Sequence, residues 1–274
     1  MASINTNLQA LQAQNALSVN NRQLNSSMSQ LSTGLRVNAA SDDAASLAIG
    51  NRMQTRVLSL NQTIRNANDG ISMIQTADSA AQSLSESLFR MNELAIQASN
   101  DTNGTSDRTA LNAEFTQLQA GMTSIINGTT WNGMSLLNST ATYNYQVGAN
   151  GANSSTSDAV GVTFTSLSTL SALSASGVGT SANAASAITA VSSSLTTINS
   201  NRSAWGAAIN RLTYAADNSA NVSMNLSASK SQLMDTDYAK TTANMARAQI
   251  LQDAGTAMLS QANQQSFSVL QLLN

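Results

Sequence analysis

The chain has 274 residues, a formal net charge of −2, 9% charged residues, and no Pro, Cys or His. Without Cys it has no disulfide, thiolate nucleophile or zinc–thiolate site. Without His it lacks the commonest general base and metal ligand. The acidic balance argues against nucleic-acid binding, which requires a basic patch. No stretch approaches the ~20 consecutive apolar residues of a membrane span, and the start lacks the regions of a cleaved signal peptide.

The first 35 residues predict a nearly uncharged amphipathic helix. Apolar residues step by four and three from Ile4 to Leu11 and, after a slip in register, from Leu17 to Leu35, which is the spacing of a coiled-coil seam. Arg22 is the one charged residue before Leu35, and the other faces carry Gln, Asn, Ser and Ala. Because a helix in water usually carries charges there, this helix is predicted to be surrounded by protein.

A very long helix is predicted next, since no Pro interrupts the chain. Gly34 is placed to end the first helix, and Ser41, Asp42 and Asp43 provide an N-cap and first-turn carboxylates for the second. Apolar residues then recur with a spacing of four and three up to about Asn100. At 1.5 Å per residue such a helix is roughly 85 Å long.

The remaining elements follow from turn residues and periodicity. Turn chemistry at 100–107 separates the long helix from a shorter one that ends near Gly128, so these two helices are expected to be antiparallel neighbours. Residues 143–147 and 160–164 favour strands. A third helix is expected from about Ile188 to Met234, and a last, nearly uncharged one after the cap residues 235–237, running to Asn274.

The predicted fold class is therefore mainly α. We expect a long antiparallel helical bundle or coiled coil with a small β-hairpin region at about 130–180 and paired N- and C-terminal helices. Residues 1–40 plus 236–274 form one predicted domain and residues 41–235 the other. Because nearly uncharged helices are marginal alone, the two ends are expected to order on assembly; the alternative is a single autonomous bundle.

Specific motifs resemble those of bacterial flagellins along nearly the whole chain. They lie near both termini and in the predicted hairpin region, and include Leu31-Ser32-Thr33-Gly34-Leu35-Arg36, Asp42-Asp43-Ala44-Ala45-Ser46-Leu47-Ala48-Ile49, Trp131-Asn132-Gly133-Met134-Ser135-Leu136-Leu137 and Ala246-Arg247-Ala248-Gln249-Ile250-Leu251. The resemblance implies a structural subunit that polymerises into the flagellar filament. Such a subunit is exported unfolded by the flagellar type III apparatus, is secreted, and lies outside the cell.

The same resemblance implies partners and an organisation into layers. The partners are other copies of the chain, an export chaperone, the filament cap and the animal Toll-like receptor for flagellin. The terminal domain would form the inner filament core and the middle domain the outer bundle, with no large outer domain inserted after the hairpin region. The alternative is a hook–filament junction protein, which resembles flagellin at both ends.

Candidate site residues follow from the seams and from the resemblance. The seams of the two end helices supply the candidates for self-assembly, which are Leu8, Leu11, Leu24, Leu31, Leu251, Leu259, Leu270 and Leu273. Arg90, Leu94 and Glu114 match the positions that contact the receptor in activating flagellins. No catalytic constellation can be assembled, and no cofactor or metal is expected.

Several charged or polar residues have two interpretations. Asp42 and Asp43 are predicted to cap a helix rather than to act as a catalytic or metal-binding pair, since no third ligand accompanies them. Arg36 and Arg52 either lie in solvent or pair with these carboxylates. Arg202 interrupts an apolar seam, either as a buried polar residue or with its charge extended to water. The Ser- and Thr-rich stretch 153–181 is either a glycosylated surface or an unmodified loop.

Overall fold

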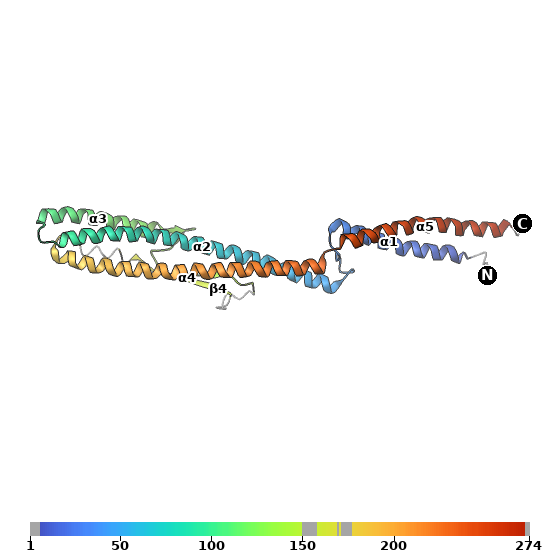
Figure 1. The fold of residues 1–274 in the computed structure, drawn as a ribbon, viewed down its shortest axis with the longest axis horizontal. Helices are drawn as coiled ribbons and strands as arrows, with labels where there is room; N and C mark the ends of the chain where they lie inside the picture. The colour runs from blue at the N-terminus through green and yellow to red at the C-terminus, as the bar shows by residue number, and fades with distance from the viewer. Residues whose placement is uncertain (1–5, 150–157, 169, 171–176, 272–274) are drawn as a thin grey trace. The chain divides into compact units, whose positions relative to one another are not determined.

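The computed structural model describes residues 6–149, 158–168, 170 and 177–271. In these ranges it contains helices α1 (Leu8–Thr33), α2 (Ala44–Ser99), α3 (Thr105–Gly128), α4 (Ser181–Met234) and α5 (Tyr238–Gln271), and strands β1 (Thr130–Trp131), β2 (Met134–Ser135), β3 (Ala141–Gln146) and β4 (Ala159–Phe164) (Figure 1). The predicted fold class is confirmed, with long helices, a small β region and paired terminal helices. Among the helices that the structure describes, none has the length and apolarity required to span a bilayer.

Local side-chain chemistry sets the ends of α1. The Asn7 Oδ1 accepts the Ala10 N–H at 3.0 Å and so caps the first turn. At the other end Gly34 has a φ of 73°, and its N–H donates to the Gln30 carbonyl. This left-handed conformation is one that residues with a Cβ rarely adopt, so the predicted helix end at Gly34 is confirmed.

Asp43 is the residue that caps α2. Its Oδ1 accepts the Ser46 N–H at 2.9 Å and its other oxygen accepts the Ser46 hydroxyl; these bonds, the hydroxyl first, hold the pKa of Asp43 below its usual range. Asp42 closes the preceding turn by accepting the N–H groups of Asn38 and Ala39. The Arg36 guanidinium lies 3.9 Å from Asp43 and donates to the Leu233 carbonyl. Asp43 thus caps the helix as predicted, whereas Asp42 stabilises the turn before it.

The chain divides into two compact units. The terminal unit consists of residues 1–55 and 225–274, and the central unit of residues 56–224. These boundaries follow contacts within one chain, so the division after residue 40 and before residue 236 stays a prediction about layers in a polymer. Within the terminal unit, α1 and α5 run antiparallel, and a backbone bridge joins Leu35 to Asp235 where the helices meet their connecting segments (Figure 1).

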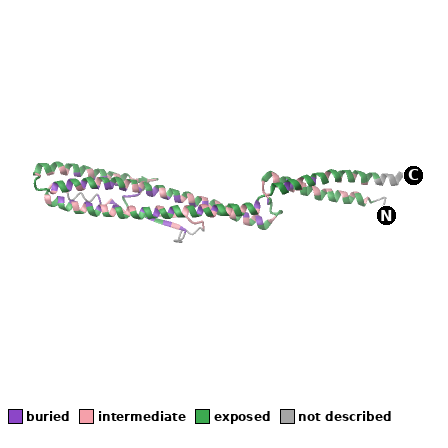
Figure 2. Cartoon of the chain, viewed as in Figure 1, coloured by how far each residue is buried: buried purple, intermediate pink, exposed green. Residues whose placement is uncertain are grey.

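The apolar core lies in the central unit. Buried side chains follow one face of α2 with a spacing of three and four, from Ala67 to Ala98, and face α3, α4 and strand β4. Figure 2 shows buried residues along these helices and few along the end helices. In the described part of the end helices the buried residues are Ser27, Thr241 and Ala248. A helix pair with so little buried surface is only weakly stabilised by its own chain.

The β region covers one side of the central helices. Asn132 and Gly133 have φ values of 48° and 80°, as a two-residue hairpin turn requires. Strands β3 and β4 pair antiparallel, from Ala141 opposite Phe164 to Gln146 opposite Ala159, and match the predicted strands. The absence of a side chain at Gly70 leaves room for the Tyr145 ring, since a Cβ there would lie 2.8 Å from its Cδ1.

Arg202 is neither buried nor free in solvent. Its Nε lies 2.7 Å from the Asp78 Oδ1, and both side chains are about one-third exposed (35% and 37%). The hydrogen bond to Asp78 raises the pKa of Arg202. The polar residue in the predicted seam therefore pairs across α2 and α4 at the edge of the core.

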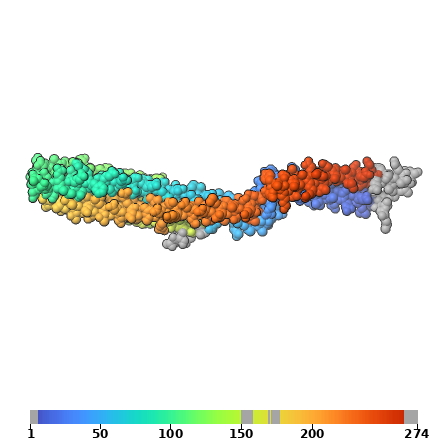
Figure 3. All heavy atoms as spheres, in the orientation of Figure 1, coloured from blue at the N-terminus to red at the C-terminus, as the bar shows by residue number. Residues whose placement is uncertain are grey.

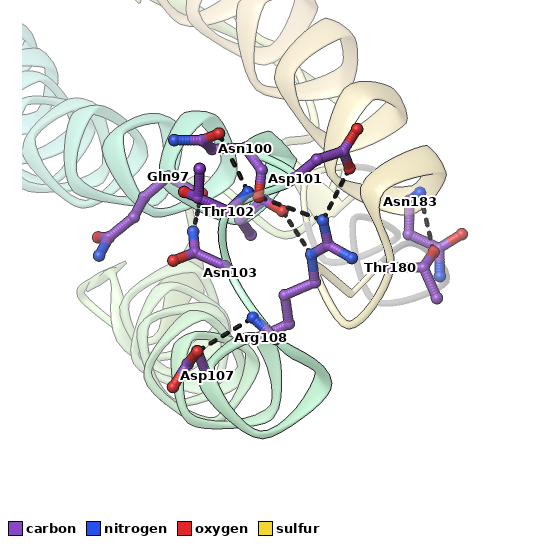
Figure 4. Close-up of polar contacts among 11 residues, drawn as sticks. Gln97, Asn100, Asp101, Thr102, Asn103, Asp107, Arg108, Thr180 and Asn183 are labelled. Atoms are coloured by element: carbon purple, nitrogen blue, oxygen red, sulfur yellow. Dashed lines mark hydrogen bonds and ion pairs between the residues drawn. The ribbon is translucent and has the colours of Figure 1, made fainter.

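Arg108 closes the C-terminal end of α2 (Figure 4). Its Nε donates to the Ala98 carbonyl at 2.9 Å, and its terminal nitrogen to the Asn100 carbonyl and the Asp101 carboxylate. Only 17% of this side chain is exposed. A cation at this position satisfies carbonyls left without helical partners and complements the negative end of the helix dipole.

Replacing Arg108 with alanine is therefore expected to lower the free energy of unfolding of the central unit by about 1–2 kcal/mol. Arg108→Lys is the matched control, because it keeps the charge and loses the planar donor fork. In urea unfolding, the free energy of unfolding of the lysine variant should lie between those of the wild type and the alanine variant. Equal stability of all three proteins would show that these hydrogen bonds contribute nothing net.

Candidate assembly interface

The two end helices pack through small and polar side chains. Leu17 lies over Gly255, where an added Cβ would come within 2.7 Å of the leucine Cδ2. The Asn20 amide donates to the Ala248 carbonyl at 2.7 Å, and the Asn7 amide to the Ala262 carbonyl at 3.0 Å. Figure 3 shows the blue atoms of α1 against the red atoms of α5 along this pair. The close approach depends on residues without bulky side chains on α5.

Replacing Gly255 with valine is expected to force α1 and α5 apart, because the new side chain occupies the space of Leu17. If this pairing is required for assembly, the critical concentration for polymerisation should rise at least several-fold. Adding Leu17→Ala to the same chain should make room for the valine, and should therefore bring the critical concentration part of the way back to the wild-type value. An unchanged critical concentration for the single variant would mean that the close pairing does not matter.

The predicted self-assembly leucines divide into exposed and half-buried ones. Leu8, Leu11 and Leu251 are 66%, 59% and 54% exposed. Leu24, Leu31 and Leu259 are half-buried. Leu270 lies in the last turns of α5, but its side chain is outside the described part of the structure, as is the whole of Leu273.

The seam predicted for the start of α1 does not face α5. Leu8 and Leu11 point away from it, and Ala10 and Ala13 are half-buried instead. The change of face falls at the slip in register between Leu11 and Leu17, because residues in step with Leu17 lie on a different side of the helix from Leu8. Periodicity identified the apolar stripe at the start of α1, but it did not show which side of α1 packs against α5.

Sequence reasoning missed further exposed apolar side chains on these helices. They are Val19 on α1 and Ile250 and Met258 on α5, each more than half exposed; Met28, which lies in the seam predicted for the first helix, is exposed as well. Comparing each position with the seam of its own helix would have identified Val19 and Ile250, since both lie off that seam. Single exposed apolar residues are ordinary, but this number on two helices with few charges indicates a surface that contacts other protein.

The receptor candidates lie in the central unit and do not share one environment. The Arg90 guanidinium contacts Glu114 across α2 and α3 at 2.8 Å and Glu93 on its own helix at 3.0 Å. The side chains of Arg90 and Glu114 are about half exposed, at 51% and 46%. Leu94 is only 1% exposed. It packs in the core, and its contact with a receptor stays a prediction.

Two family models and several known proteins match this chain. The model of the bacterial flagellin N-terminal helical region matches residues 4–142, and that of the C-terminal helical region matches residues 188–273. A flagellin of Halalkalibacterium halodurans is 43% identical over 271 residues, which cover 98% of this chain and 99% of that protein. The flagellar filament 33 kDa core protein of Treponema phagedenis is 34% identical, with 98% and 99% covered.

A crystal structure of Bacillus cereus flagellin is also similar, with 30% identity and a TM-score of 0.49 over 57% of this chain and 88% of that one. The two family models together span both helical ends, and the full-length relatives match from end to end. The chain belongs to the bacterial flagellin family.

Proposed function

We propose that this chain is the structural subunit of a bacterial flagellar filament used for swimming. The observation that carries the proposal is the exposed apolar surface of α1 and α5, on helices with almost no charge. Two full-length relatives are named as a flagellin and a filament core protein. None of these features favours the alternative of a hook–filament junction protein. In the polymer, residues 1–40 and 236–274 form the inner core and residues 41–235 the outer layer.

Seeded polymerisation tests this function. Purified chain added to short filament fragments at high salt should elongate them into helical filaments visible by electron microscopy. The positive control is that the same seeds elongate when given a known flagellin. If the control succeeds and this chain gives only discrete particles under the same conditions, the proposal is contradicted. The amount of protein in cells separates the alternative, since a filament subunit greatly exceeds a junction protein.

We also propose export of the unfolded chain to the extracellular filament, with a chaperone before export and a cap at the growing tip. The composition supports passage in the unfolded state. With no Cys there is no disulfide to reduce, and with no Pro there is no slow prolyl isomerisation to delay refolding at the tip. In a strain without the flagellar export apparatus, the protein is expected to be missing from the extracellular filament fraction of the culture.

Recognition by the animal Toll-like receptor for flagellin is a further proposal, supported by the exposed ion pair of Arg90 with Glu114. Arg90→Ala and Glu114→Ala should each lower the response of an epithelial reporter to purified monomer about tenfold, since a charged interface contact contributes about 1.4 kcal/mol or more. Arg211→Ala, which removes an exposed arginine from α4, is the control and should change little. No response to the wild-type monomer would rule the proposal out.

A further inference from the structure

The exposed apolar side chains of the α1–α5 pair lie on two different sides of it. Leu8, Leu11 and Val19, here called the outer stripe, are 66%, 59% and 57% exposed. At about 100° per residue these positions group on the side of α1 turned away from Leu17, which is the residue that packs on α5. The outer stripe therefore has no partner on the described part of this chain.

A groove runs along one flank of the same pair. It has a volume of about 680 Å³ and is open between Ala13 and Ala16 on α1 and Ala254 on α5, with Leu17 and Gly255 among the residues that line it. Leu251 and Met258 also line it and are 54% and 64% exposed, so its walls are largely apolar. The outer stripe does not line the groove.

The opposite flank of the pair has a different character. The same angular reasoning places Gln14 and Asn21 on that side of α1, and Gln252 and Thr256 on that side of α5. Leucine side chains pressed against these amides and hydroxyls would remove them from water without replacing their hydrogen bonds, which is unfavourable. The groove is also lined by the amides of Gln9, Gln12, Asn20 and Gln261, but its alanines, Leu17, Leu251 and Met258 make it the better fit for an aliphatic ligand.

We propose that the groove of one copy receives the outer stripe of α1 from a second copy. This rests on the proposed filament function and assigns the two complementary surfaces of its core contact. Both surfaces include α1, on different sides of one helix, so a chain cannot fill its own groove with its own stripe. A contact between two different surfaces leaves a free groove at one end and a free stripe at the other, so it adds copy after copy into a helical polymer wherever the rotation does not close a ring.

Cysteine cross-linking tests this assignment without background, because the chain contains no Cys. Leu11→Cys subunits and Ala254→Cys subunits are mixed, polymerised on wild-type seeds and mildly oxidised, and disulfide-linked peptides are identified by mass spectrometry. Since a disulfide requires Cα atoms about 4.4–6.8 Å apart, the linked 11–254 peptide reports the stripe in the groove. Thr256→Cys, on the opposite flank, replaces Ala254→Cys in the control mixture.

The expected result is an 11–254 cross-link at several times the yield of the 11–256 cross-link, in filaments and not in monomers. An 11–256 link of equal or greater yield, or links between two copies of residue 11, would overturn the assignment while filaments still form. If Leu11→Cys prevents polymerisation, Val19→Cys takes its place in the same comparison. Failure of the wild-type chain to polymerise would instead contradict the proposed function.

Discussion

Replacing Trp205 with alanine is expected to lower the free energy of unfolding of the central unit by about 3–5 kcal/mol, the usual cost of removing a large buried aromatic side chain. Trp205 is 1% exposed, and its ring centroid lies 5.6 Å from that of Phe164. Its Nε1–H also donates to the Thr163 carbonyl at 3.3 Å. The substitution thus removes a stacking contact and a hydrogen bond between α4 and β4, and urea unfolding followed by circular dichroism measures the loss of stability.

Tyr214→Ala on the same helix provides the matched control. Tyr214 is 73% exposed, so its truncation should change the free energy of unfolding by no more than about 0.5 kcal/mol. Trp131 remains in the Trp205 variant as a fluorescent reporter of the β region. If the two variants lose the same stability, the aromatic contacts between the hairpin and α4 do not hold the central unit together.

Placing a lysine at Leu24 or Leu259 is expected to abolish polymerisation and to leave the central unit folded. Both leucines are half-buried on the end helices, where neighbouring copies would bury them further. Burying an unpaired ammonium costs several kcal/mol, and each 1.4 kcal/mol is tenfold in an equilibrium constant. The critical concentration should therefore rise by about two orders of magnitude or more, as measured by sedimentation of seeded reactions.

The control for these variants keeps the position apolar. Leu24→Met and Leu259→Met preserve volume and hydrophobicity and should polymerise close to the wild-type level. Thermal unfolding of the central unit should be the same in all four proteins. Normal filaments from either lysine variant would show that these positions remain in water in the polymer.

The elements of this fold could be predicted because local chemistry and periodicity agree along most of the chain. Gly34 ends α1 because its left-handed backbone conformation suits glycine, and Asp43 starts α2 because its carboxylate caps the first turn. Neither feature depends on residues distant in sequence. The heptad spacing of α2 likewise identified its buried face from Ala67 to Ala98, which packs against α3, α4 and strand β4.

The side chains whose neighbours lie far away in sequence could not be placed in this way. Arg202 interrupts an apolar seam, and its partner Asp78 is found only once α2 and α4 are side by side. Leu94 matches a receptor-contact position by resemblance, and only the folded chain shows that its side chain is buried in the core. The apolar residues at the start of α1 were identified, but their exposure depends on how α1 turns against α5. Spacing along one helix does not fix that rotation.

Hydrogen exchange of the same protein as monomer and as filament tests the central claim most directly, namely that the end helices are completed by neighbouring copies. Amides in residues 8–33 and 238–264 should exchange rapidly in the monomer and at least about a hundredfold more slowly in the filament, because their opening then requires loss of intersubunit contacts. Core amides of α2 between Ala67 and Ala98 should be protected in both forms. End helices that are equally protected in monomer and filament would contradict the account.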